Sequence, residues 1–140
     1  MSATCVFCQI VAEQVPAHLV HRDDGVIAFL DRSPLVPGHV LVAPRAHVPT
    51  LDDLPADQMA PVFELVRRVS VAIQGALGAD GSFVAVNTRV SQSVAHLHVH
   101  VVPRRQKDGF FSPRMLWKRQ AYASDDHAAK TAAMLRSALG

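Results

Sequence analysis

Three histidines, His96, His98 and His100, stand at alternate positions of an apolar run that spans residues 94–102 and precedes Pro103. A run rich in β-branched residues is typical of a strand, and alternate residues of a strand share one face. We therefore expect the three imidazoles to form a row. Each of them would need a polar partner, because a buried polar group without one costs about 1–3 kcal/mol. Such a row is more typical of a functional site than of an ordinary core.

Geometry limits how many of these histidines one metal ion can bind. The outer pair are four residues apart, so their Cα atoms would lie roughly 13 Å apart at about 3.3 Å per residue. An imidazole and a Zn–N bond of about 2.1 Å together reach roughly 6–7 Å. This argues against all three on one ion. At least one imidazole is left for acid–base or nucleophilic chemistry, to which an ordinary pKa of about 6.5 is suited.

A second chemical pattern lies near the N-terminus, where Cys5 and Cys8 form a C-x-x-C motif. In a chain without an export signal, this motif indicates metal or redox chemistry rather than a structural disulfide. Thioredoxin-like redox pairs begin a helix that follows a strand, and no strand is predicted before Cys5. The motif is also compatible with a metal site or with two buried structural cysteines.

Length and charge set broad limits on the class of protein. The 140 residues suffice for one domain with a core, spanning 1–140, and the net charge of +2 indicates no particular partner. No stretch approaches the roughly 18 apolar residues of a membrane span, and the N-terminus lacks the basic and apolar segments of a secretory signal. We therefore expect a cytoplasmic protein without a membrane partner.

Basic residues concentrate in the last third of the chain. They are Arg104, Arg105, Lys107, Arg114, Lys118 and Arg119, with Phe110, Phe111 and Trp117 among them. Surfaces that bind nucleic acid interleave basic side chains with more numerous stacking aromatic rings. We interpret the cluster as a solvated face, expect no nucleic-acid partner, and consider the three aromatic residues equally well placed for packing between subunits.

The hydrophobic pattern predicts the elements that position these residues. A short helix covers about 7–12, and strands fall at about 19–22, 26–31, 39–43, 83–87 and 95–103. A long helix ends at Gly78, and Pro61 predicts that it either starts afresh near Ala60 or is kinked. Ser124 caps a C-terminal helix. Hairpins and one long helix, without alternating strands and helices, indicate an α+β fold with an antiparallel sheet of about five strands.

Taken together, these motifs resemble the histidine triad (HIT) family, and within it the Hint-like bacterial branch that carries an N-terminal C-x-x-C. The matching segments run from Cys5 to Trp117 and comprise residues 5–11, 28–31, 37–44, 92–94, the three histidines and 102–104. The resemblance implies a HIT-like fold, a homodimer, and a cleft that binds a purine nucleotide with its α-phosphate over the triad.

The same resemblance implies a nucleotide hydrolase or transferase that acts at the α-phosphate of a nucleoside phosphoramidate, anhydride or ester, through a nucleotidyl-histidine intermediate. Amine, acyl, phosphate and sugar leaving groups all stay open. One alternative is a nucleotide-binding or interaction module with little turnover. Another is a metalloenzyme with a catalytic zinc ion on the triad.

By this resemblance, individual roles fall on matched positions. His98 is the nucleophile, His100 lies against the phosphate and the leaving group, and His96 and His39 orient His98. Asp31 binds the ribose hydroxyls. Further nucleotide contacts fall on Phe7, Ile10, Phe29 and Leu41 around the base, and on Asn87, Gln92 and Ser93 near the phosphate.

The resemblance also assigns the C-x-x-C motif to zinc. Relatives with this N-terminus complete a Cys₂His₂ site, and the matching residues here are Cys5, Cys8, His47 and His96. Four protein ligands make a closed structural site rather than a catalytic one. The site uses one triad histidine, which agrees with the reach of an imidazole.

The chain departs from the family pattern at two places. The stretch 87–91 is shorter than in the family and contains no glycine. We expect the guanidinium of Arg89 to replace the missing glycine amides with bidentate contacts to phosphate. Relatives often have glycine where Glu13 stands, at the end of the first helix, and we interpret this second departure as local.

Overall fold

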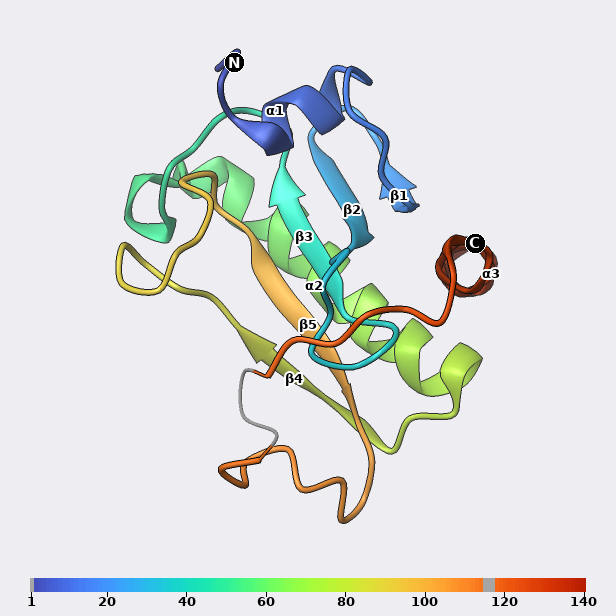
Figure 1. The fold of residues 1–140 in the computed structure, drawn as a ribbon. Coiled ribbons are helices and arrows are strands. Elements are labelled where there is room, and N and C mark those ends of the chain that lie inside the picture. The colour runs from blue at the N-terminus through green and yellow to red at the C-terminus, as the bar shows by residue number, and fades with distance from the viewer. Residues whose placement is uncertain (1, 115–117) are drawn as a thin grey trace.

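The computed structural model describes residues 2–114 and 118–140. Its elements are, in chain order, α1 (Val6–Val11), β1 (Leu19–Arg22), β2 (Val26–Leu30), β3 (Val40–Pro44), the 3₁₀ helix η1 (Leu51–Asp53), α2 (Ala56–Leu77), β4 (Gly81–Ala85), β5 (Val99–Arg104) and α3 (Asp125–Leu139). The strands form one antiparallel sheet in the order β1-β2-β3-β5-β4 (Figure 1). The predicted α+β fold is confirmed. Trp117, considered above for subunit packing, lies outside the described residues.

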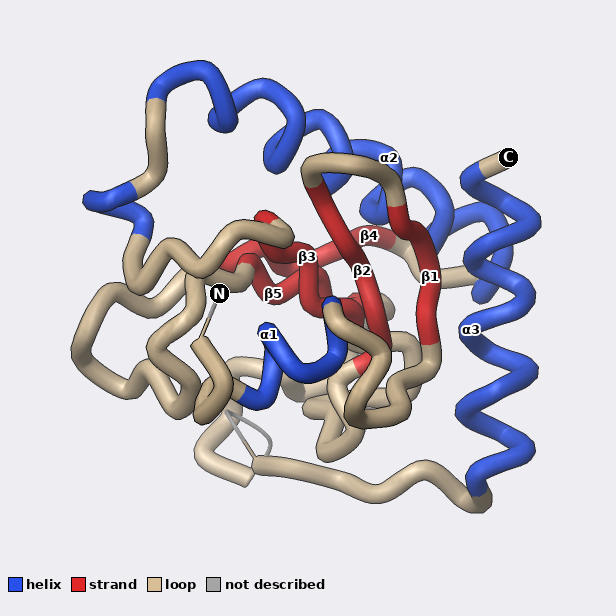
Figure 2. Tube along the Cα trace, turned by 90° about the horizontal axis from the view of Figure 1, so that it is seen from above, coloured by secondary structure: helices blue, strands red, loops and turns tan. Residues whose placement is uncertain are grey.

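Alternation along the strands separates two apolar cores, one on each face of the sheet. In β2, Val26, Ala28 and Leu30 belong to the core formed with α2 and α3. Ile27 and Phe29, between them, pack with α1. Figure 2 shows α1 and α2 on opposite sides of the sheet, with α3 beside the β1 edge. Because successive residues of a strand point to opposite faces, a sheet covered on both sides needs apolar residues at every position.

The strand predicted at 95–103 is shorter than expected. β5 begins at Val99, so of the three histidines only His100 lies within it. The segment before β5 pairs with the loop that follows β3, where Leu97 N–H donates to the Val48 carbonyl at 2.6 Å. Strand-like alternation nevertheless continues through this segment, since Leu97 and Val99 both belong to the core under α2. The histidines therefore turn toward the opposite face, on the side of α1.

Helix α2 runs without interruption from Ala56 to Leu77, with Pro61 inside it. The predicted fresh start near Ala60 is therefore wrong. Proline removes the hydrogen bond from its own nitrogen to the carbonyl four residues earlier, and in the second turn this affects one bond near the helix end. Gly78 ends the helix with φ at 66°, in the left-handed conformation expected of a terminal glycine. Neither α2 nor any other described helix is both long enough and apolar enough to cross a membrane.

Residues 118–124, which we call the C-terminal strap, cross the loop between β2 and β3 (Figure 1). Backbone N–H of Gln120 donates to the Pro34 carbonyl at 2.7 Å. The Tyr122 hydroxyl accepts from Gly38 N–H at 2.9 Å. These contacts fix the strap against a loop that lies far from it in the sequence, immediately before α3 begins.

Glu13 follows α1 in a backbone conformation that disfavours its side chain. Its φ is 60°, in the left-handed region that glycine adopts readily and other residues do not. The carboxylate forms an exposed ion pair with Arg22 at 2.9 Å. An exposed pair contributes at most about 1 kcal/mol, whereas a left-handed residue with a Cβ costs roughly 1–2 kcal/mol.

We therefore predict that Glu13→Gly has a free energy of unfolding about 1 kcal/mol higher than Glu13→Ala. Both variants lose the ion pair with Arg22, and only glycine relieves the strain. Urea denaturation of the two variants and the wild-type protein measures the difference. Equal stabilities for the two variants would show that the backbone at residue 13 stores no strain.

Candidate active site and metal centre

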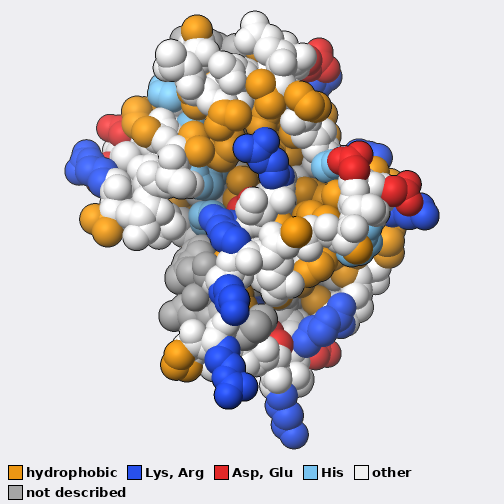
Figure 3. All heavy atoms as spheres, viewed as in Figure 1, with side chains coloured by type: hydrophobic (Ala, Val, Ile, Leu, Met, Phe, Trp, Pro, Cys, Tyr) orange, Lys and Arg blue, Asp and Glu red, His pale blue; other side chains and the backbone are white. Residues whose placement is uncertain are grey.

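A cleft of about 860 Å³ opens on the face of the sheet that carries α1. Its lining includes the predicted site residues Phe7, Ile10, Phe29, Asp31, Leu41, Ser93, His98 and His100, together with Arg119 from the C-terminal strap. Figure 3 shows histidine and hydrophobic side chains gathered in the middle of this face, with Lys and Arg side chains beside them. The structure thus brings together, in one cavity, an apolar region, the carboxylate of Asp31 and the imidazoles of His98 and His100.

The row of three histidines divides between two sites. His98 and His100 line the cleft, whereas His96 joins a group with Cys5 and Cys8. All three side chains are buried, and none is more than 5% exposed. The division agrees with the limited reach of an imidazole along a strand-like segment.

A chain of hydrogen bonds fixes the proton positions on His39 and His100. Leu35 N–H donates to His39 Nδ1 at 3.0 Å, so that nitrogen carries no proton. Neutral His39 therefore carries its proton on Nε2, which donates to His100 Nδ1 at 2.9 Å. The proton of neutral His100 is then on Nε2, as a hydrogen-bond donor.

Both imidazoles of this chain are held neutral. Burial, reinforced by the neighbouring His100, lowers the pKa of His39 to about 2. Burial also lowers the pKa of His100 to about 4, with a smaller contribution from His98. The proton assignments above, which require neutral rings, are therefore consistent with the environment of both residues.

His98 is oriented by a backbone carbonyl. Its Nδ1–H donates to the His96 carbonyl oxygen at 2.7 Å, which leaves the lone pair of the neutral ring on Nε2. Burial lowers the pKa of His98 and so keeps that lone pair unprotonated. The ring also packs edge-on against Phe7 and His100, with centroid distances of 5.0 Å in both cases.

The sequence analysis expects His96 and His39 to orient His98, and the geometry shows which group of each residue makes the contact. The orienting group at His96 is its backbone carbonyl, because the imidazole is turned toward the cysteines. The ring of His39 contacts His100 instead. His96 therefore acts on His98 through its backbone carbonyl, and His39 acts on His100 through its ring.

Asp31 is fixed from several directions at the edge of the cleft. Its Oδ1 accepts from Ser33 N–H at 2.9 Å. Its Oδ2 accepts from Arg119 Nη1 at 2.5 Å and lies 3.7 Å from His39 Nε2. Arg119 was missed by the sequence analysis, where it belonged to a basic cluster interpreted as a solvated face. Arg119 is exposed, as that interpretation expects, but it also lines the cleft, and no local pattern could have paired it with a carboxylate 88 residues away.

Three residues expected to contact the nucleotide, Asn87, Arg89 and Gln92, do not belong to the described lining of the cleft. The side chain of Gln92 donates to the Pro49 carbonyl at 2.6 Å. Arg89 Nη1 lies 3.9 Å from Asp52 Oδ2. These contacts turn both side chains toward η1, so the expected replacement of glycine amides by Arg89 receives no support from the geometry.

The backbone of this glycine-free loop adopts conformations that glycine would favour. Arg89 has φ at 68° and Ser91 has φ at 60°. Asn87 Nδ2 donates to the Ser91 carbonyl at 3.3 Å, inside the loop. The loop therefore reaches the left-handed region without the residue type best suited to it.

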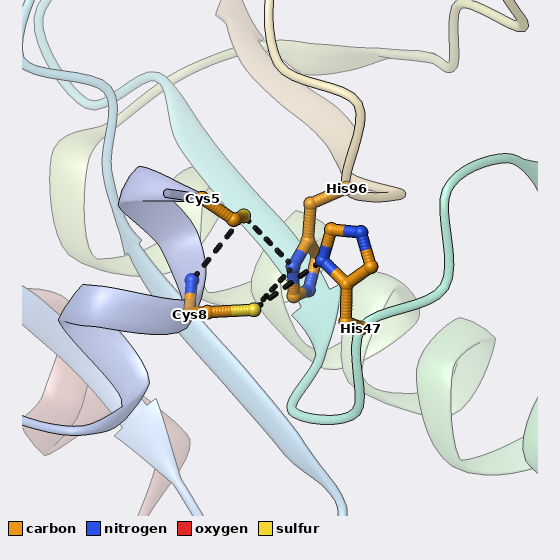
Figure 4. A group of neighbouring side chains, drawn as sticks. All are labelled: Cys5, Cys8, His47 and His96. Atoms are coloured by element: carbon orange, nitrogen blue, oxygen red, sulfur yellow. Dashed lines mark hydrogen bonds between the residues drawn. The ribbon is translucent and has the colours of Figure 1, made fainter. Parts of the chain in front are cut away.

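The four predicted metal ligands lie together at the end of α1 (Figure 4). Cys5 Sγ is 3.4 Å from His96 Nδ1, and Cys8 Sγ is 3.3 Å from His47 Nδ1 and 3.6 Å from His96 Nδ1. The ligand atoms of all four residues lie within 4.8 Å of one another. The predicted Cys₂His₂ group is thus assembled by the fold.

The arrangement fits a tetrahedral zinc ion. Zn–S and Zn–N bonds of about 2.3 and 2.1 Å place ligand atoms about 3.6 Å apart at tetrahedral angles, close to the sulfur–nitrogen distances found here. His96 Nε2–H donates to the Pro44 carbonyl at 2.8 Å, which leaves Nδ1 unprotonated and directed at the sulfurs. Burial raises the pKa of the Cys5 thiol, which disfavours the thiolate. A bound cation would stabilise the thiolate and so favour loss of the proton.

Comparison with known proteins finds sequence similarity to members of one protein family. The family model described as the HIT domain matches residues 12–107. The chain is 39% identical over 107 residues to an uncharacterised HIT-like protein of Methanocaldococcus jannaschii, covering 75% of this chain and 82% of that protein. It is 32% identical over 134 residues to the adenylylsulfatase HINT3 of Arabidopsis thaliana, covering 94% of this chain and 68% of that protein.

Among solved structures, the fold is similar to that of a zinc-bound histidine triad family protein from Mycobacterium smegmatis. The TM-score is 0.83, with 33% sequence identity, and the match covers 97% of this chain and 93% of the other. The similarity therefore extends over nearly the whole of both chains.

The neutral, buried imidazoles of His39 and His100 predict that acid destabilises the fold. In the unfolded chain both would have the ordinary pKa of about 6.5, so between that pH and the folded pKa the unfolded state binds more protons. The stability they contribute is present above about pH 6.5 and is lost as pH falls, at about 1.4 kcal/mol per pH unit for each group.

Between pH 6.5 and 5.0, the free energy of unfolding of His39→Gln should therefore fall by about 2 kcal/mol less than that of the wild-type protein. Urea unfolding at the two pH values measures this difference. His127→Gln, which removes an imidazole from the exposed surface of α3, is the matched control and should follow the wild-type curve. If His39→Gln shows the wild-type acid dependence, His39 is not held neutral in the folded state.

Proposed function

The chain belongs to the HIT family, and on that basis we propose that it is a nucleotide hydrolase or transferase that acts at the α-phosphate of a purine nucleoside phosphoramidate, anhydride or ester. The observation that carries the proposal is the state of His98. A nucleophilic imidazole needs an unprotonated nitrogen toward its substrate and a held proton on the far nitrogen. His98 lines the cleft with its Nδ1–H bonded to the His96 carbonyl.

The reaction proceeds in two displacements. His98 Nε2 attacks the α-phosphorus, a phosphorus–nitrogen bond forms, and the bond to the leaving group breaks with its electron pair departing on the leaving group. The Nε2–H of His100 donates a hydrogen bond to the phosphate or to the leaving group as charge develops there. Water then attacks phosphorus, the electron pair of the phosphorus–nitrogen bond returns to His98, and a proton is released to solvent.

The remaining cleft residues provide the nucleotide site. Phe7, Ile10, Phe29 and Leu41 form an apolar region that suits a purine base. Asp31, held by Ser33 N–H and Arg119, keeps acceptor positions on both oxygens for the ribose hydroxyls. A relative named as an adenylylsulfatase supports a nucleotide substrate for this chain.

The second candidate is a nucleotide-binding module with little turnover, which the same pocket would serve. The proposal also includes a homodimer, for which Phe111, 59% exposed, is available at the surface. Phe110, in contrast, is buried within its own chain and is not a subunit contact.

The nucleophile assignment predicts that His98→Asn reduces kcat by about 10²–10⁴ or more, because the covalent route is lost. Binding of a nucleoside monophosphate should stay within a few-fold of wild type. His127→Asn is the control for removal of a histidine. Rapid acid-free quenching of the wild-type enzyme with an α-labelled substrate should trap label on His98. Near-wild-type turnover by His98→Asn would exclude this nucleophile, and wild-type binding without turnover would support the binding module.

We also propose that Cys5, Cys8, His47 and His96 hold one structural zinc ion. Bound there, zinc would cross-link α1 to the loop after β3 and to the segment before β5. That segment contains the carbonyl of His96 that orients His98, so the same ion would help to hold His98 in position. It would not take part in the reaction.

Freshly purified, reduced protein should contain about one zinc ion per chain by atomic emission, and Cys8→Ala should contain almost none. Loss of the ion should lower the unfolding temperature by roughly 10 °C, as expected for about 3 kcal/mol in a domain of this size. A catalytic zinc ion would give a different result, because chelation would then abolish activity without lowering the unfolding temperature. Wild-type protein free of zinc would refute the site.

A further inference from the structure

Arg119 places in the cleft a guanidinium group with unused hydrogen-bond donors. Both of its hydrogen bonds use Nη1, which donates to Asp31 Oδ2 at 2.5 Å and to the Ser33 carbonyl at 2.9 Å. A guanidinium has five N–H donors, and none of the hydrogen bonds found among the described residues uses Nε or Nη2 of Arg119. The side chain is 40% exposed and lines the same cleft as His98 and His100.

The charge of Arg119 acts on the reacting groups themselves. It opposes protonation of His39 and His100, lowering the pKa of each in addition to the larger effect of burial. The guanidinium of Arg119 lines the cleft and, while one nitrogen is paired with Asp31, keeps donors for a second anionic group. Its planar fork matches the geometry of an oxyanion such as sulfate, phosphate or carboxylate.

A leaving group that departs as an anion needs no proton from the triad. His100 presents a neutral Nε2–H, which donates a hydrogen bond but is a poor source of a proton. An amine has to gain a proton as it leaves, whereas sulfate, phosphate or a carboxylate does not. A cation beside the triad would stabilise the charge that such a group acquires.

We propose that Arg119 determines specificity by binding an anionic leaving group, so that the enzyme prefers mixed anhydrides of a nucleoside monophosphate over phosphoramidates that release an amine. In this arrangement Nη1 stays on Asp31, and Nε and Nη2 bind the departing oxyanion. The inference rests on the proposed function, and it names the substrate class of that same site.

Two substrates that differ in the leaving group test the proposal by turnover. Arg119→Ala should lower kcat/KM for adenosine 5′-phosphosulfate by about 10–100-fold, as expected for a lost charged hydrogen bond, and for adenosine 5′-phosphomorpholidate by less than about 3-fold. Arg119→Lys keeps the charge without the planar fork. Its kcat/KM for adenosine 5′-phosphosulfate should lie between the values for the wild type and Arg119→Ala. Lys118→Ala removes a neighbouring charge from the same strap and should leave both values unchanged. Equal losses on both substrates would mean that Arg119 only holds the strap and Asp31 in place, and would overturn the proposal.

A binding measurement separates this proposal from the nucleophile assignment. ADP carries an extra anionic group beyond the α-phosphate, and AMP does not. In the His98→Asn background, calorimetry should show ADP bound about 10-fold more tightly than AMP, and adding Arg119→Ala should abolish that preference. If the wild-type enzyme turns over neither substrate but this preference is present and depends on Arg119, the proposed function fails and the anion site stands. A preference that survives Arg119→Ala, or no preference at all, refutes the anion site.

Discussion

The need to pair every buried ring nitrogen organises the centre of this molecule. Four imidazoles, His39, His96, His98 and His100, are buried within a small volume. Within the residues that the structure describes, no buried side-chain nitrogen or oxygen lacks a hydrogen-bond partner. For His39, His96 and His98 the partner that settles the tautomer is a backbone group, which cannot change its own protonation, and the tautomer of His100 follows from that of His39. The fold therefore determines which nitrogen of each histidine is basic, and chemistry follows from that choice.

One short segment connects the two sites. The His96 imidazole belongs to the cysteine–histidine group, while its carbonyl oxygen holds the proton of His98. A movement of this residue would therefore alter the group at the end of α1 and the orientation of His98 together. The cysteine–histidine group and the cleft thus share one short stretch of main chain, although their side chains point to different places.

Local patterns predicted what is locally determined, whereas contacts between distant segments escaped them. The stop at Gly78 and the cap at Ser124 are confirmed, because each depends on residues within a few positions of itself. The cleft position of Arg119 depends instead on the path of the C-terminal strap, and the bond between His39 and His100 joins residues 61 positions apart. Each of these residue types is compatible with many partners, so composition and spacing alone do not select one. The resemblance to a family, and not periodicity, associated His39 with the triad, where its ring contacts His100.

The glycine-free loop ahead of the cleft has a consequence for how the site accommodates molecules of different size. Arg89 and Ser91 adopt left-handed backbone conformations. Unlike glycine, they have few other backbone conformations open to them. Side chains with a Cβ restrict the unfolded loop as well, so less disorder is lost when it folds. The loop that leads to Ser93 is thus restricted in conformation, and adjustment to a bulkier ligand is easier for the strap, which is attached to the rest of the chain by a few hydrogen bonds.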